Sequence, residues 1–209
     1  MYIIWDWSGT LIDDVALSLG VVNKMLEKRG LPALSTDRYR ELYTFPMDGF
    51  FRSLGLLAEG EQPEAFTALT DEFVEGYTKR AMRFTLRPGA QEALERMREA
   101  GHDQVLITSS RNTVLRKQVY RSRLGHYFEA VLGTWSSMPA NTYSVARMYL
   151  LSRGIAGSGA LFVGDTTGVF GTARELGSGC LLVSGGHESR RRLAGSGCRV
   201  VGGLDEVEV

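Results

Sequence analysis

The sequence has little of several features that mark specialised classes of protein. Its 209 residues include only two cysteines, too few for a disulfide framework. Basic and acidic residues balance at 24 each, so no excess of positive charge favours a nucleic acid or an anionic membrane as partner. No apolar run approaches the roughly 18 residues that a membrane span needs. We therefore expect a protein that binds neither nucleic acid nor membrane.

Lysine is also scarce. The sequence has four lysines, and the last is Lys117, so no ammonium side chain comes from the rest of the chain. Met1 leads into an apolar run without a basic leader, and together with the two isolated thiols this favours a cytoplasmic protein. No pattern in the sequence indicates an oligomeric state.

Apolar runs that alternate with amphipathic stretches predict an α/β fold. Strands are expected at residues 2–5, 104–108, 130–133, 160–164, 179–184 and 199–201. Between the later strands the spacing predicts helices at 90–100, 112–124 and 142–153, with shorter ones further on. Such alternation forms right-handed βαβ units, so we expect a doubly wound parallel sheet of the Rossmann-like kind.

One segment interrupts the alternation. It shows no convincing strand, and its apolar spacing predicts helices at 14–29, 37–43, 48–54 and 63–82. We therefore expect an all-helical cap domain at 14–83, inserted after the first strand of a core domain formed by residues 1–13 and 84–209. Four cap aromatics, Phe45, Phe50, Phe51 and Tyr77, are expected in the cap interior, with pocket walls as the alternative.

The expected topology locates a candidate site. Ligands of parallel sheets bind at the carboxyl ends of the strands, which here are followed by residues 6–10, 108–111, 133–142 and 164–169. Asp6 and Asp165 each come directly after an apolar strand. Two carboxylates at one edge of a sheet can share a divalent cation, and Mg²⁺ favours carboxylates together with water and phosphate oxygens. Either aspartate could instead cap a turn or a helix.

Three motifs resemble those of the haloacid dehalogenase-like superfamily. The run Asp6-Trp7-Ser8-Gly9-Thr10-Leu11-Ile12-Asp13 is similar to its first motif, D-x-D-G-T-L-x-D. Thr108 falls at the position of its second motif, and Gly164-Asp165-Thr166 resembles its fourth. The dipeptide Phe45-Pro46 and residues 183–190 are similar to phosphoglycolate-phosphatase-like members, which have a small helical cap. The resemblance covers essentially the whole chain.

The resemblance implies transfer of a phosphoryl group from a small phosphorylated molecule to water. Asp6 would attack phosphorus as the nucleophile, and water would then hydrolyse the aspartyl phosphate. Mg²⁺ would be held by Asp6, by the backbone carbonyl of Ser8 and by Asp165. The family's second-motif position implies that Thr108 binds a phosphate oxygen. Ser109 and Arg111, expected at the N-terminus of the helix that follows, would bind the phosphate as part of an anion cradle.

The position of the family's acid/base aspartate holds a different residue. Ser8 stands there, and a hydroxyl does not exchange protons near neutral pH. General acid–base catalysis contributes roughly 10²–10⁴-fold, so an unmodified mechanism would lose about that much.

Two further charged groups are missing. The family's third-motif lysine would fall near Thr142, where no lysine exists, so Arg111 or Arg147 would have to replace it. Val169 stands where the fourth motif has its last acidic residue.

These departures leave three functions open. The first is a Mg²⁺-dependent phosphohydrolase of weak or narrow activity that uses Asp6. The second is a pseudo-enzyme that binds a phosphorylated ligand or a protein partner. The third is a redirected, non-hydrolytic enzyme of specialised metabolism, in which Asp6 or Ser8 would act as a base or a hydrogen-bonding group.

Two minor features complete the expectations. The pattern around Trp7 is also similar to that of phosphonoacetaldehyde hydrolases, which use a cap lysine, and the candidate here is Lys24. His102, His126 and His187 share no metal-ligand spacing and are expected at the surface or in loops.

Overall fold

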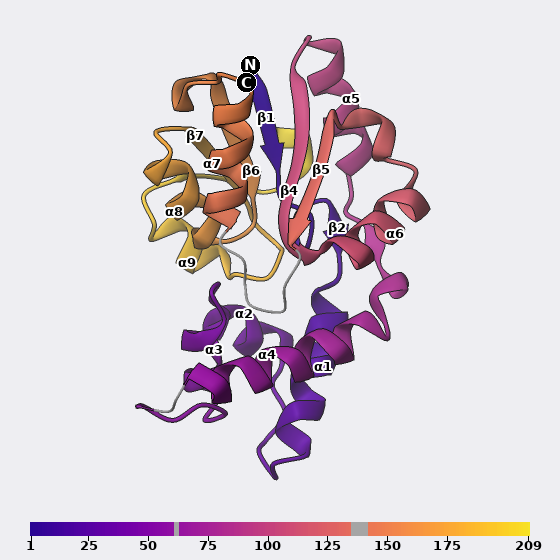
Figure 1. Cartoon of the computed structure of the whole chain (residues 1–209). Helices are drawn as coiled ribbons and strands as arrows, with labels where there is room; N and C mark the ends of the chain where they lie inside the picture. The colour runs from indigo at the N-terminus through magenta and orange to yellow at the C-terminus, as the bar shows by residue number, and fades with distance from the viewer. Residues whose placement is uncertain (61–62, 135–141) are drawn as a thin grey trace.

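The computed structural model describes residues 1–60, 63–134 and 142–209. Its central feature is a sheet of six parallel strands in the order β5-β4-β1-β6-β7-β8 (Figure 1). The strands are β1 Tyr2–Trp5, β4 Asp103–Arg111, β5 Ala130–Thr134, β6 Ala160–Gly164, β7 Gly179–Val183 and β8 Arg199–Val201. The order continues outward from β1 in both directions, which confirms the predicted doubly wound α/β sheet.

Helices cover both faces of the sheet. They are α5 Ala90–Glu99, α6 Asn112–Ser122, α7 Thr142–Ser152, α8 Thr167–Glu175 and α9 Arg190–Ala194, with short 3₁₀ turns at Ala81–Arg83, Gly125–Tyr127, Gly157–Gly159 and Leu204–Glu206. Ile3 and Trp5 pack with α5 and α6 on one face, whereas Ile4 packs with α7 and α8 on the other. Because successive side chains of a strand point to opposite faces, burial on both faces explains why β1 is apolar throughout.

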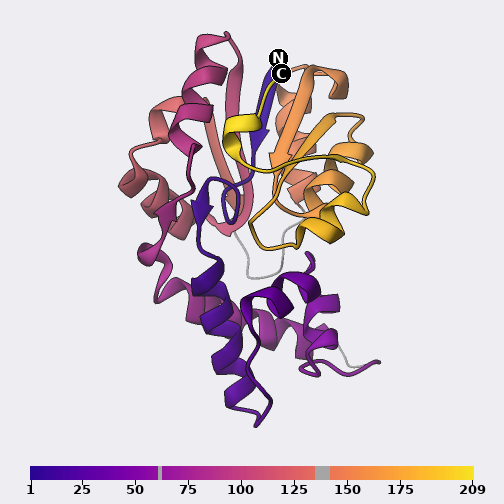
Figure 2. The same cartoon turned by 180° about the vertical axis from the view of Figure 1, so that it is seen from behind.

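The segment after β1 is helical, as predicted. It contains α1 Val15–Glu27, α2 Thr36–Leu42, α3 Asp48–Ser53 and α4 Pro63–Thr78, which together we call the helical segment. Its apolar cluster is separate from those of the sheet and is centred on fully buried side chains such as Val22, Phe50 and Phe51. Figures 1 and 2 show the helical segment beyond the carboxyl ends of the strands. The division into two domains at residues 13/14 and 83/84 stays a prediction.

Two details differ from the sequence-based expectation. A pair of short antiparallel strands, β2 Ile12–Asp13 and β3 Thr85–Leu86, joins the two connections to the helical segment. Strands of two residues carry no periodicity, so only the pairing reveals them. In addition, β4 continues to Arg111, past an irregularity after Ile107, so Ser109 lies at the end of a strand rather than at the start of a helix.

None of the helices in the described part of the chain is long and apolar enough to cross a membrane.

Candidate active site

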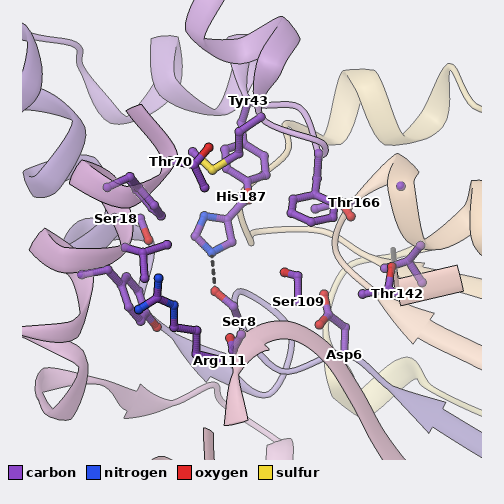
Figure 3. Close-up of a pocket in the computed structure, with 18 of the residues that line it drawn as sticks. Asp6, Ser8, Ser18, Tyr43, Thr70, Ser109, Arg111, Thr142, Thr166 and His187 are labelled. Atoms are coloured by element: carbon purple, nitrogen blue, oxygen red, sulfur yellow. Dashed lines mark hydrogen bonds between the residues drawn. The ribbon is translucent and has the colours of Figure 1, made fainter. Parts of the chain in front are cut away.

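A pocket lies between the carboxyl ends of the strands and the helical segment (Figure 3). Asp6 and Ser8, from the loop after β1, reach it together with Ser109 and Arg111 from the end of β4. His187, from the loop after β7, also lines it. The structure thus brings together residues of three strand ends, of which those of β1 and β4 were predicted and that of β7 was not. Residues 135–141, within the loop expected at 133–142, lie outside the described part.

Asp6 and Asp165, which we call the carboxylate pair, end the neighbouring strands β1 and β6. The backbone N–H of Trp7 donates to Asp6 Oδ1 over 2.7 Å, and Thr108 also hydrogen-bonds to Asp6. Burial and the charge of Asp165 raise the pKa of Asp6 to about 7. Burial also raises the pKa of Asp165. Neither carboxylate therefore has a partner that fully offsets its charge.

Asp165 is completely buried and tightly enclosed. Thr10 Oγ1 donates to its Oδ1 over 3.0 Å, and the backbone N–H of His187 donates to its Oδ2 over 2.6 Å. A Cβ atom at Gly9 or at Gly186 would lie 2.2 Å from Asp165 Oδ2, so only glycine permits both loops to approach this closely. The helix cap considered for Asp165 is not formed, since Thr166 is the N-cap residue of α8.

Ser8, Asp14 and His187 form a second group, which we call the serine cluster. Ser8 Oγ donates to Asp14 Oδ2 over 2.6 Å, and His187 Nε2 lies 3.0 Å from Ser8 Oγ and 3.2 Å from Asp14 Oδ1. Burial raises the pKa of Asp14, but the hydrogen bond and charge of His187 outweigh it and bring the pKa below its usual value. Burial lowers the pKa of His187, but Asp14 outweighs it in turn and raises that pKa. The two charges therefore stabilise each other.

The helical segment fixes the orientation of His187. Tyr39 OH lies 2.8 Å from His187 Nδ1, and the ring of Tyr43 stacks on the imidazole at 5.0 Å between centroids. Arg40 Nε donates to the carbonyl of Gly186 over 2.9 Å, which holds the loop itself. Because the Ser8 hydroxyl hydrogen points to Asp14, Nε2 is the nitrogen that donates to Ser8 Oγ, and Nδ1 faces the Tyr39 hydroxyl. Burial raises the pKa of Tyr39 well above its usual value, so this hydroxyl keeps its proton.

Arg111 is the basic residue that lines the pocket. Its Nη2 lies 3.4 Å from Asp71 Oδ1 on α4, and its Nε is buried without a hydrogen-bond partner among the described residues. Arg147, the other proposed replacement for the missing lysine, is exposed and does not line the pocket. Of the two arginines, Arg111 is therefore the one in position to meet a bound anion.

Some sequence-based expectations need correction. His187 lies in the loop after β7, one of the two expected environments, but it is only 3% exposed and so is not a surface residue. Lys24 is exposed and does not line the pocket that holds Asp6, which removes the lysine that a phosphonoacetaldehyde hydrolase would need. The cap aromatics divide: Phe50 and Phe51 are core, whereas Phe45 and Tyr77 also line the pocket.

Sequence reasoning missed Asp14 and the role of His187. The two residues are far apart in the chain, and no local spacing connects them. A usable signal was present nonetheless, since Gly185-Gly186-His187 follows an apolar strand and so reaches the same edge of the sheet as Asp6.

The model of the haloacid dehalogenase-like hydrolase family matches residues 3–183, which is most of the chain. The chain belongs to this family. Among curated members, a phosphoglycolate phosphatase from Rhodobacter capsulatus is 28% identical over 187 residues, covering 88% of this chain and 84% of that protein. Another, from Pseudomonas savastanoi, is 24% identical over 197 residues, covering 92% and 72%.

Solved structures agree with the family's fold. A haloacid dehalogenase-like hydrolase from Streptococcus pneumoniae is similar with a TM-score of 0.80, at 17% identity over 98% of this chain and 95% of that one. CbbY from Rhodobacter sphaeroides, solved with phosphate, gives a TM-score of 0.70 at 18% identity, with the same coverages of 98% and 95%. At these identities the likeness establishes the fold.

The residues at the site fit the Mg²⁺ ion that the family implies. Asp6 and Asp165 supply two adjacent carboxylates whose negative charges repel each other. A divalent cation bound between them would offset this repulsion. Among the described residues no three His, Cys, Asp or Glu side chains form a metal site by themselves. The backbone carbonyl of Ser8, water and substrate oxygens would therefore complete the coordination.

Proposed function

We propose that the protein is a Mg²⁺-dependent phosphohydrolase that acts on a small phosphorylated metabolite through Asp6. The observation that carries this proposal is the position of the Asp6 carboxylate. It ends β1 at the pocket, beside Asp165, with one oxygen fixed by the Trp7 N–H. A carboxylate held in this way is a competent nucleophile once its negative charge is stabilised.

The reaction would run in two steps. An Asp6 oxygen attacks phosphorus, the bond from phosphorus to the ester oxygen breaks, and the alcohol leaves with a proton. Water then attacks the aspartyl phosphate at phosphorus, which releases inorganic phosphate and restores the Asp6 carboxylate. Bound Mg²⁺ would supply positive charge to the transferring phosphoryl group.

Arg111 and Ser109 would bind the phosphate oxygens. Both line the pocket that Asp6 also lines, and the Nε of Arg111, without a partner among the described residues, leaves a donor for an anion. Buried Thr108 hydrogen-bonds to Asp6 and would hold the nucleophile in place. Arg111 would take over the charge of the missing lysine, with a planar guanidinium in place of an ammonium group.

The proton on the leaving group needs a donor other than Ser8. His187 Nε2 lies 3.0 Å from Ser8 Oγ, lines the pocket and is held in orientation by Tyr39. We infer that His187 holds and moves this proton at Nε2. His187 lies behind Ser8, so its Nε2 would be further from the ester oxygen than the carboxyl group of an aspartate at position 8 would be. We therefore expect slow or narrow turnover.

The test of the nucleophile is phosphate release from a broad panel of phosphate monoesters, 2-phosphoglycolate included, with and without Mg²⁺. Asp6→Asn should lower the rate by about 10³-fold or more. Asp103→Asn, which changes an exposed aspartate at the far end of β4, is the matched control and should keep the rate. No release above the Asp6→Asn background for any ester would contradict hydrolysis and favour a pseudo-enzyme that binds without turnover.

The role of His187 is tested by the dependence of the rate on the leaving group. In His187→Asn we expect a large loss for an alkyl phosphate but little loss for 4-nitrophenyl phosphate, whose leaving group departs without a proton. Both esters are measured on the same sample, so partial unfolding cancels in the ratio. An equal loss for both esters would contradict proton transfer by His187.

A further inference from the structure

The helical segment presents an apolar wall to the nucleophile. The aromatic and aliphatic side chains that it contributes to the pocket include Tyr43, Phe45, Phe66, Phe73, Val74 and Tyr77. The sheet side adds Ile107, Val114 and Val169. The part of a substrate that extends from the phosphate toward the helical segment would therefore contact mainly carbon.

Formal charge is sparse in the same pocket. Among the described residues that line it, the charged or readily charged side chains are Asp6, Arg111 and His187. The sequence of residues 135–141 contains no acidic or basic residue. Arg111 is the single arginine or lysine of the described lining, and the charge of His187 is paired with that of Asp14. Once Arg111 binds the phosphate, no unpaired cation remains for an acidic leaving group.

Val169 shows the same trend at the sheet side. Its isopropyl group lines the pocket at the position where the family's fourth motif has an acidic residue. A Cβ atom at Gly164 would lie 2.6 Å from Val169 Cγ2, so the glycine gives this side chain the room to pack there. The position therefore supports an apolar surface rather than a charged one.

The aromatic wall is held in place by specific contacts. Tyr77 OH donates to Asp14 Oδ2 over 2.5 Å, and its ring stacks on Phe73 at 6.2 Å between centroids. Phe45 lies against the sheet side, since its carbonyl oxygen would be 3.0 Å from a Cβ at Gly168. A wall whose rings are fixed before binding loses little conformational entropy when a ligand packs against it.

We propose that the site selects phosphate monoesters of apolar alcohols of aromatic-ring size and discriminates against leaving groups that carry a carboxylate. This specificity rests on the proposed phosphohydrolase function for its chemistry, whereas the preference in binding follows from the pocket lining. An apolar ring gains contact area against Phe73, Tyr77 and their neighbours. A carboxylate in the same place loses its hydration without gaining an unpaired cation.

The test uses two esters that differ by one carboxylate, benzyl phosphate and 4-carboxybenzyl phosphate, with the full-length protein and Mg²⁺. We expect kcat/KM to favour benzyl phosphate by about tenfold or more. Val74→Lys places one cation in the wall and should reduce or reverse that preference. Ala68→Lys adds the same charge on the exposed side of α4, away from the pocket, and should keep it.

A binding measurement separates this inference from hydrolysis. Benzylphosphonate and 4-carboxybenzylphosphonate cannot be hydrolysed as esters, and their affinities are compared by calorimetry. Tighter binding of benzylphosphonate without turnover of either ester would contradict the phosphohydrolase and support the apolar site. Turnover that favours the carboxylated ester, or shows no preference in the wild-type protein, would overturn the specificity while supporting hydrolysis. Failure to bind or hydrolyse any of the four compounds would overturn both.

Discussion

The carboxylate pair and the serine cluster are neighbours at one pocket, and burial raises the pKa of an aspartate in each, yet the net pKa shifts of Asp6 and Asp14 are opposite. The pKa of Asp6 is raised to about 7, since burial and Asp165 both act against its charge. The pKa of Asp14 is lowered, since His187, Ser8 and Tyr77 donate to it and outweigh burial. In the serine cluster the charge of Asp14 is offset by His187, a residue of the same cluster. The carboxylate pair has no such partner and needs a cation that the chain does not supply.

The largest expected effect tests the pairing of the His187 and Asp14 charges in the serine cluster. His187→Asn leaves the buried charge of Asp14 without its partner, so the free energy of unfolding should fall by about 3–5 kcal/mol. Adding Asp14→Asn removes the unpaired charge, and the double variant should be less destabilised than the sum of the two single ones. Chemical denaturation of the four proteins gives the coupling, and additive effects would contradict the pairing.

An intermediate effect is expected from Mg²⁺ at the carboxylate pair. A ligand at 100 times its dissociation constant stabilises a protein by about 2.7 kcal/mol, so saturating Mg²⁺ should raise Tm by several degrees. Asp165→Asn should lose most of this rise, whereas Asp14→Asn, in the serine cluster, should retain it. Calorimetry measures the rise in Tm with Mg²⁺ for both variants. An equal rise would contradict the assignment of the metal to the carboxylate pair rather than to the serine cluster.

A further expected effect is the pH dependence of the metal-free protein. The pKa of Asp6 is about 7 when folded and 3.8 in its ordinary state, so between these values the folded protein binds a proton that the unfolded chain releases. Stability should therefore fall as pH rises from about 4 to about 7. Asp6→Asn lacks this proton, and its stability relative to wild type should increase over the same window. Denaturation in chelator across that range checks this, and parallel curves would contradict the raised pKa.

Local patterns predicted most elements of the fold. The strands at 160–164 and 199–201 have the predicted bounds, and the helices at 112–122 and 142–152 end close to where they were expected. The parallel order followed from the alternation of strand and helix, because right-handed crossovers leave few alternatives. The sequence also predicted that Asp6, Ser8 and Arg111 reach the site, since all three lie at or just past the carboxyl end of a strand, and these ends meet at one edge of a parallel sheet.

The partners of these residues came only from the tertiary structure. Asp14 and His187 are 173 positions apart, and their contact depends on how α2 and the loop after β7 pack together. The choice of Arg111 over Arg147, and of Phe45 over Phe50 as a pocket wall, also depended on three-dimensional packing. The sequence by itself determined the sheet, the helical segment and the carboxylates at the sheet edge, because these depend on local periodicity. The charge balance of the site and the apolar character of its wall were decided by contacts between distant segments.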